Sequence, residues 1–312
     1  MNKIPILVFC DQNFLIGLGR QGEPYQERLK GLLAGQKVRF VLSPWHWVEM
    51  ARGKNPTASL ALADYAESLE PLWVRERRTL QKNEVAAALF GWLGVPYTKL
   101  DPLASRAEVI ADINRQPVAQ VAQVTSRDFV GYLRSSPTAM DPIVRGYEEN
   151  LKAVEVLRKA RREGRLTPEV QQRADRELVR RSLPDYTPSG LKIDDTTKRE
   201  FLGQVDLQRL PTIAAEISTS QYGWDSPRLL THQEHIDRLH AVCALPHVDL
   251  IGSDDIELTK TIIALKSGLR FQTACPITRS RFEQLYRLEK RHRGMFLEFW
   301  SKLVQRFRPS AS

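Results

Sequence analysis

An unbroken apolar run at residues 4–10, Ile-Pro-Ile-Leu-Val-Phe-Cys, is the feature that most constrains how this chain folds. A β-prone run without polar alternation is typical of a strand covered on both faces, as in a parallel sheet between helices. Shorter, mostly apolar runs occur at residues 38–42 and 248–253, each with one charged residue, and a helical pattern follows each of them. The sequence therefore predicts an α/β fold in which a mostly parallel sheet is flanked by helices.

The long middle of the chain has a different character. From residue 57 to residue 208 the apolar spacing is helical, with no convincing buried strand. We therefore predict one discontinuous α/β domain, residues 1–56 and 209–312, interrupted by a large all-helical insertion at residues 57–208. Such an insertion is compatible with the fold because the entropy cost of closing a loop rises only slowly with its length. Helices are expected at residues 23–33, 44–52, 58–69, 83–93, 106–124, 142–163, 168–181, 231–245, 256–267, 281–291 and 295–307, and a last strand at residues 268–274.

Charge and cysteine content narrow the kind of protein. A formal net charge of +9 favours an anionic partner, with nucleic acid first and an acidic membrane surface second. The three cysteines are widely spaced in apolar segments and form neither a disulfide framework nor a zinc site, so we expect a reducing, cytoplasmic location. No apolar run approaches the roughly 20 residues of a membrane span. We therefore expect neither a secretory signal nor a membrane segment.

Carboxylates recur where the strands of this sheet are expected to end. The carboxyl ends of parallel strands share one sheet edge, where open α/β proteins bind their ligands. Adjacent acids repel each other there unless a cation neutralises them, and hard cations such as Mg²⁺ prefer oxygen ligands. For the acids after the third run, the alternative is an ordinary N-cap of the helix expected from residue 256. The acids in question are Asp11, Glu49, Asp237, Asp254 and Asp255.

These motifs, in this order, resemble those of the PIN-domain (PIN-like) ribonucleases. In that family an apolar strand ends in an acid with Asn two residues later, and a Ser/Thr-Pro helix start carries a Glu. An Asp on a later helix then precedes a strand that ends in Ser/Thr-x-Asp. The resemblance covers residues 1–55 and 230–290, and it is closer to the divergent, larger bacterial and phage members than to the compact toxins. The matching residues are Asp11 with Asn13, Ser43-Pro44 with Glu49, and Asp237 with Ser253, Asp254 and Asp255.

The resemblance implies a PIN-like sheet and a metal-dependent endoribonuclease. Asp11, Glu49, Asp237 and Asp255 would be catalytic and would hold one or two Mg²⁺ or Mn²⁺ ions, with Asp254 as an auxiliary ligand and no side-chain nucleophile. A toxin, an antiviral defence effector and an RNA-processing factor all fit this chemistry. Two alternatives stay open: a structure-specific DNA nuclease that uses the same metals, and a catalytically silent nucleic-acid-binding or scaffold protein. Self-association and a protein partner or inhibitor also stay open.

Cations near the acids and on the helical segment are candidates for phosphate contacts. Residues 158–181 are rich in Lys and Arg but also hold acids, so a solvated mixed-charge face is the alternative there. His240 shares a helix face with Asp237 and either contacts a phosphate or is simply packed. Trp45 and Trp47 either stack on bases or fill the core. The candidate nucleic-acid-binding residues are Asn13, Arg52, Lys54, Arg161, Arg162, Arg176, Arg180, His240, Ser253 and Lys260.

Overall fold

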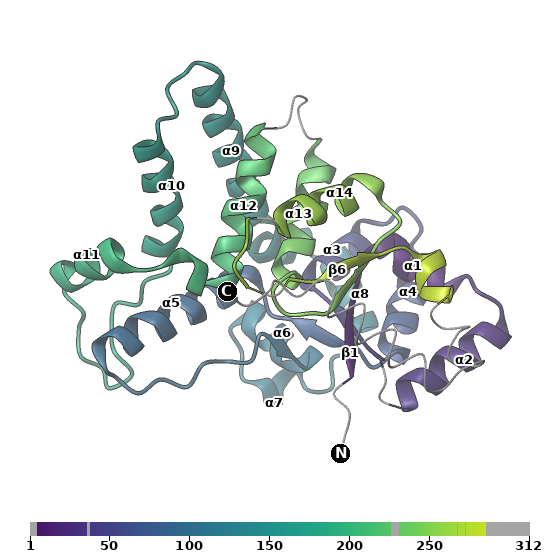
Figure 1. Ribbon diagram of the computed structural model, residues 1–312. Helices are drawn as coiled ribbons and strands as arrows, with labels where there is room; N and C mark the ends of the chain where they lie inside the picture. The colour runs from purple at the N-terminus through teal and green to yellow at the C-terminus, as the bar shows by residue number, and fades with distance from the viewer. Residues whose placement is uncertain (1–4, 36–37, 226–230, 267, 272, 285–312) are drawn as a thin grey trace.

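The computed structural model describes residues 5–35, 38–225, 231–266, 268–271 and 273–284 (Figure 1). Within these residues the chain forms a six-stranded sheet in the order β4-β3-β2-β1-β5-β6. All neighbouring pairs are parallel except β3 and β4, which are antiparallel. The predicted α/β fold with a mostly parallel sheet is therefore confirmed. The strands are β1 (Ile6–Cys10), β2 (Val38–Leu42), β3 (Leu72–Val74), β4 (Leu103–Ala104), β5 (Leu250–Gly252) and β6 (Cys275–Ile277).

The first apolar run forms β1, which pairs with β2 on one side and with β5 on the other. Val8, Phe9 and Cys10 are completely buried, as expected for a strand with helices over both faces. Because side chains alternate along a strand, Val8 and Cys10 belong to one core and Phe9 belongs to another. The absence of polar alternation in this run thus reflects a strand in the middle layer of a three-layer arrangement.

Helices cover the two faces of the sheet in separate layers. One layer contributes Phe14, Trp47 and Phe129 to the first core, and the other contributes Val242 and Ile262 to the second. The first layer consists of α1 (Gln12–Gly19), α2 (Glu23–Ala34), α3 (Pro44–Arg52), α4 (Pro56–Ser68), α6 (Arg106–Asn114), α7 (Val118–Val121) and α8 (Ser126–Ser135). The second consists of α12 (Pro211–Asp225), α13 (His232–Ala244), α14 (Ile256–Lys266) and the start of α5 (Arg77–Leu93).

A third, smaller core joins the rest of α5 and α12 to further helices, through Val85, Val179, Phe201 and Ile213. Its helices include α10 and α11, and α10 forms with α9 a hairpin that extends away from the sheet in Figure 1. None of the helices in the described ranges has both the length and the apolar composition needed to cross a lipid bilayer. The remaining elements are α9 (Asp141–Arg162), α10 (Pro168–Arg180), α11 (Asp195–Gln204), η1 (Pro137–Met140) and η2 (Leu207–Arg209).

The structure corrects the prediction of an all-helical insertion at residues 57–208. Both β3 and β4 lie within this segment and complete one side of the sheet. They have three and two residues, too few to show the period that distinguishes a strand from a helix. α6 and α8 also pack on the sheet, through Val109 and Phe129, so this part of the segment belongs to the α/β core. The helix predicted at residues 106–124 ends at Asn114, because Arg115 has a left-handed backbone with φ 54°.

The last strand is also displaced from its predicted place at residues 268–274. β6 consists instead of Cys275, Pro276 and Ile277. A proline argues against a strand because it lacks the N–H of the ladder, but β6 is an edge strand, where that loss is tolerated. The helix predicted at residues 295–307, and most of the one predicted at 281–291, lie outside the described residues. Four α-helices in the described residues, α1, α8, α11 and α12, had no counterpart in the prediction.

Candidate metal centre

A cavity of about 230 Å³ opens at the edge of the sheet where β1, β2 and β5 end. The four acids that the sequence singles out as catalytic all line it, and they come from four different helices. Asp11 precedes α1, Glu49 lies on α3, Asp237 lies on α13 and Asp255 precedes α14. The parallel strand order thus gathers residues that lie far apart in the sequence. The other lining residues are Gln12, Asn13, Ile16 and Leu258.

Asp11 is the most buried of the four acids, with 9% of its surface exposed. It is the N-cap of α1, and its Oδ1 accepts a hydrogen bond from the backbone N–H of Phe14 at 2.6 Å. Its Oδ2 accepts a hydrogen bond from the hydroxyl of Ser253. Burial raises the pKa of Asp11 to about 6; the two hydrogen bonds offset part of the rise, and the charges of Asp254 and Asp255 add to it. The folded protein therefore holds this carboxylate charge at a cost.

Ser253 links two of the acids. It is fully buried, and its Oγ also accepts a hydrogen bond from the backbone N–H of Asp255 at 3.0 Å. Asp255 Oδ1 in turn accepts from the N–H groups of Glu257 at 2.7 Å and Leu258 at 3.0 Å, which makes Asp255 an N-cap for α14. The capping alternative is therefore correct for Asp255, yet the same residue lines the cavity. One carboxylate oxygen is fixed by the helix, and the second oxygen is left for a ligand.

Asp254 has a different role from its neighbour. It is exposed and is not among the residues that line the cavity. Its Oδ1 accepts a hydrogen bond from the backbone N–H of Arg279 at 2.9 Å, and its Oδ2 lies 3.6 Å from the Arg279 guanidinium. An auxiliary ligand role for Asp254, which the sequence suggests, has no support in this arrangement.

The helix that carries Glu49 also contains, in its first turn, a buried histidine that the sequence analysis did not single out. His46 is completely buried at the third position of α3, and its Nδ1 accepts the backbone N–H of Ser43 at 3.0 Å. Its Nε2–H therefore donates to the carbonyl of Cys10, at 2.7 Å. Burial lowers the pKa of His46 to about 4, so the ring is neutral at physiological pH. His46 thus ties the ends of β1 and β2 together, and the signal for it was the capping-box spacing from Ser43.

The close packing of α1 on β5 depends on a glycine. A Cβ at Gly252 would lie 2.9 Å from the ring of Phe14, closer than side-chain atoms pack. Phe14 is fully buried and makes an edge contact with Phe282, so its ring cannot simply move aside. Gly252 therefore allows α1 to approach β5, and this approach brings Asp11 within hydrogen-bonding distance of Ser253.

The chemistry of the lining fits a hard divalent cation. All its polar groups are carboxylates or amides, the oxygen donors that Mg²⁺ and Mn²⁺ prefer. Gln12 Oε1 is buried and has no hydrogen-bond partner within the described part of the chain, as expected of an acceptor that a cation or a donor ligand would satisfy. Among the described residues, however, no three His, Cys, Asp or Glu side chains form a ready-made metal-binding group. The acids share a cavity without converging on one point, as like charges without a counter-ion would.

The candidate nucleic-acid contacts are dispersed. Asn13 lines the cavity, whereas Ser253 is buried beneath it. Arg52, the last residue of α3, and Lys54, which follows the helix, are exposed, and Lys260 forms an exposed ion pair within α14 at 2.9 Å. The side chain of His240 lies outside what the structure describes.

Both tryptophans of α3 are core residues. Trp45 and Trp47 have at most 1% of their surface exposed, and Trp47 stacks on Trp73 with 3.9 Å between ring centroids. The alternative of core packing is therefore correct for both. The exposed part of this helix that could contact a nucleic acid is its C-terminal end, where Arg52 lies over the Trp45 ring.

Several cations of the α9–α10 hairpin are engaged by groups on the hairpin or on the neighbouring helices α11 and α12. Arg161 pairs with Asp225 at 2.6 Å, and Arg180 pairs with Glu177 at 2.6 Å. Arg176 donates to the carbonyl of Gly203, and neither it nor Arg162 lines the acidic cavity. These pairs match the solvated mixed-charge face more closely than a phosphate-binding surface.

No family model, no curated protein and no solved structure matches this chain. Its function is therefore inferred from the chemistry of its own residues.

Proposed function

We propose that the protein is a divalent-metal-dependent nuclease that hydrolyses phosphodiester bonds, with RNA as its substrate. One observation carries the proposal: the carboxylates of Asp11, Glu49, Asp237 and Asp255 line a single cavity at the carboxyl edge of a parallel sheet. Four acids in one cavity repel one another, and a divalent cation is the partner that would turn this repulsion into binding. The order and strand context of the acids, which resemble those of PIN-like ribonucleases, support the same reaction.

Each acid would contribute in a distinct way. Asp11 is held through both of its oxygens, by Phe14 N–H and by Ser253, so its direction is fixed. Asp255 is held through one oxygen by the start of α14. Glu49 and Asp237 reach the cavity from α3 and α13, on opposite layers of the sheet. A metal bound by these carboxylates would supply the activation of a water molecule and the neutralisation of charge on the phosphate.

No other lining residue offers a nucleophile. The cavity contains no Cys, Lys, His or Ser among the described residues that line it. The nearby Ser253 hydroxyl donates a hydrogen bond to Asp11. The Cys10 thiol is fully buried, and burial raises its pKa well above the usual value. Hydrolysis by water, with carboxylates as cation ligands, is therefore the chemistry that best suits these side chains.

Cleavage of a 5′-labelled single-stranded RNA tests the proposal, in Mg²⁺, in Mn²⁺ and in excess EDTA. We expect metal-dependent cleavage by the unmodified protein and a loss of at least about a hundredfold in Asp11→Asn and Asp255→Asn, because each removes a ligand charge. The matched control is Asp254→Asn, which removes the same charge one residue away from Asp255, at a side chain that faces Arg279. Cleavage that survives in Asp11→Asn, or an equal loss in Asp254→Asn, would contradict this assignment.

The same assay separates the substrate classes. A single-stranded DNA of identical sequence tests whether the 2′-hydroxyl is needed, since a metal and its carboxylates act on the phosphate and do not read the sugar. If neither the RNA nor the DNA is cleaved with Mg²⁺ or Mn²⁺ although both bind, the protein is a nucleic-acid-binding protein without catalysis.

A further inference from the structure

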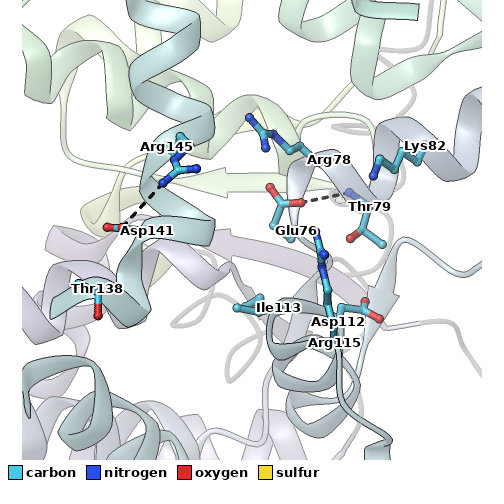
Figure 2. A pocket seen from close by; sticks show the side chains of 10 residues that line it. All are labelled: Glu76, Arg78, Thr79, Lys82, Asp112, Ile113, Arg115, Thr138, Asp141 and Arg145. Carbon is cyan, nitrogen blue, oxygen red and sulfur yellow. Dashed lines mark hydrogen bonds and ion pairs between the residues drawn. The ribbon is translucent and has the colours of Figure 1, made fainter. Parts of the chain in front are cut away.

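A second cavity, of about 410 Å³, opens at the same edge of the sheet (Figure 2). β3 runs parallel to β2, which runs parallel to β1, so all three carboxyl ends point to one side. The chain leaves β3 at this edge and reaches Glu76, on the wall of the second cavity. β3 lies two strands from β1, a separation of about 10 Å at ordinary strand spacing. The second cavity thus neighbours the acidic one along the sheet.

Cationic side chains from three helices line this second cavity. Figure 2 shows Arg145 reaching in from α9, Arg78 and Lys82 from α5, and Arg115 from the end of α6. Arg78 is paired with Glu149 at 2.5 Å, whereas Arg145 lies 3.9 Å from the carboxylate of Asp141. In the part of the chain that the structure describes, the side chains of Lys82 and Arg115 have neither a hydrogen bond nor an ion pair.

Of the three carboxylates on the wall, Asp141 lies 3.9 Å from Arg145, and the other two are held by groups other than the lining cations. Asp112 accepts a hydrogen bond from Arg75, which lies outside the cavity lining, at 2.6 Å. Glu76 is the N-cap of α5 and accepts the backbone N–H of Thr79 at 3.1 Å. Neither acid therefore neutralises Lys82 or Arg115. A single unpaired surface cation is ordinary, but two that meet in one cavity repel each other and favour an anion between them.

Arg115 is also held in a strained backbone conformation. Its φ of 54° lies in the left-handed region, where glycine is favoured and other residues are destabilised. It caps the C-terminus of α6, a position that glycine commonly occupies in helices. Among the described residues, Glu70, with φ 47°, is the only other non-glycine with a positive φ. A residue kept at such a position despite its cost points to a role for its side chain.

We propose that this cavity binds a phosphate-bearing anion. Arg115 offers a planar fork that can donate two hydrogen bonds to one phosphate, and Lys82 offers a compact charge. Arg145 and the hydroxyls of Thr79 and Thr138 complete the donors on the lining. A nucleic-acid backbone that also reaches the acidic cavity and a free nucleotide both present this chemistry. The site does not depend on the nuclease proposal, since an anion can bind here whatever the acids do.

The first test replaces Arg115 with the residue that its backbone favours. In Arg115→Gly the strain is relieved and the cation is lost, so the folded protein should melt at the same temperature or higher. Its affinity for inorganic pyrophosphate, measured by calorimetry in EDTA, should fall about tenfold or more, the loss expected for one charged hydrogen-bonding partner. Glu70→Gly is the matched control, because it relieves the same kind of strain away from the cavity lining and should bind pyrophosphate as the unmodified protein does.

The second test uses the other unpaired cation and distinguishes the two sources of phosphate. Lys82→Gln should weaken pyrophosphate binding, whereas Lys152→Gln, an exposed lysine on α9 that does not line the cavity, should leave it unchanged. ADP and a single-stranded RNA are then titrated in EDTA into the unmodified protein and into Lys82→Gln. A loss of RNA affinity with a shallower salt dependence assigns the site to a nucleic-acid backbone, and a loss confined to ADP assigns it to a free nucleotide. The proposal is overturned if no phosphate probe binds, or if Arg115→Gly and Lys82→Gln bind all three probes as the unmodified protein does.

Discussion

The substitution Asp11→Asn should make the metal-free protein more stable at neutral pH. Asn keeps the shape of the side chain and an oxygen that accepts a hydrogen bond from the Phe14 N–H. It removes the negative charge of a residue that is only 9% exposed. The pKa of Asp11 is raised from 3.8 to about 6, a rise of about two units. At about 1.4 kcal/mol per unit, the ionised carboxylate costs the folded state about 3 kcal/mol. The hydrogen bonds from Ser253 and Phe14 are already included in that value, because they offset part of the rise in the pKa.

The sign of the pH dependence follows from the direction of the shift. Because the pKa of Asp11 is raised in the folded state, its stabilising contribution is fully present below pH 3.8 and is lost as the pH rises through about 6. The two proteins should therefore differ little in stability near pH 4. At pH 7.5 the variant should exceed the unmodified protein by about 3 kcal/mol in free energy of unfolding. The buried histidines titrate in both proteins, so their contributions cancel in the difference.

Urea unfolding at pH 4.5, 6 and 7.5 in EDTA measures this difference, and a second series in millimolar Mn²⁺ completes the test. A divalent cation should stabilise the unmodified protein and have a much smaller effect on Asp11→Asn, because a ligand that binds only the folded state raises the free energy of unfolding. Asp254→Asn, whose side chain is exposed, should show neither the pH-dependent gain in stability nor the reduced response to Mn²⁺. A difference between Asp11→Asn and the unmodified protein that does not change with pH would refute the reasoning.

Three further outcomes are expected. His46→Gln should reduce the loss in free energy of unfolding between pH 6.5 and pH 4, measured by urea unfolding. Because the pKa of His46 is lowered to about 4, acid destabilises the folded protein by up to about 3 kcal/mol through this residue, and Gln does not titrate. Gly252→Ala should lower the free energy of unfolding by about 1–3 kcal/mol, because its Cβ would lie 2.9 Å from the Phe14 ring, and thermal unfolding checks this. Glu216→Gln should lower the free energy of unfolding by about 3–5 kcal/mol. It removes the carboxylate that lies 2.5 Å from the buried guanidinium of Arg77. Glu149→Gln, at an exposed ion pair, is the control and should cost at most about 1 kcal/mol.

The sequence predicted the central strands and the gathering of the acids for the same physical reason. Strands covered on both faces are largely apolar, so β1, β2 and β5 are visible as runs, and parallel strands bring their carboxyl ends to one edge. Asp11, Glu49 and Asp255 were placed there from strand order alone, and Asp237 from the helix before β5. Outer strands gave no such signal: β3 and β4 are too short for a period, and β6 contains a proline.

Contacts between distant residues could not be predicted in the same way. His46 joins the ends of two strands through hydrogen bonds to Ser43 and Cys10, and only the first of these partners is near it in sequence. The second cavity takes its cations from three helices and has no motif at all. Arg115 would have drawn attention only if its backbone angle had been known, because an Asn-Arg-Gln sequence gives no sign of a left-handed residue.

The two cavities have one property in common that a purely structural origin does not explain. Each contains a residue whose replacement by a simpler one should stabilise the fold: Asn for Asp11, whose charge is buried, and Gly for Arg115, whose backbone is strained. Core and surface positions rarely have this property, whereas binding and catalytic sites often do, because a ligand supplies the compensating interaction. For Asp11 the compensating partner would be a cation, and for Arg115 it would be an anion. A phosphate chain with its divalent counter-ion carries both, and the strands that lead to the two cavities, β1 and β3, lie two strands apart in one sheet.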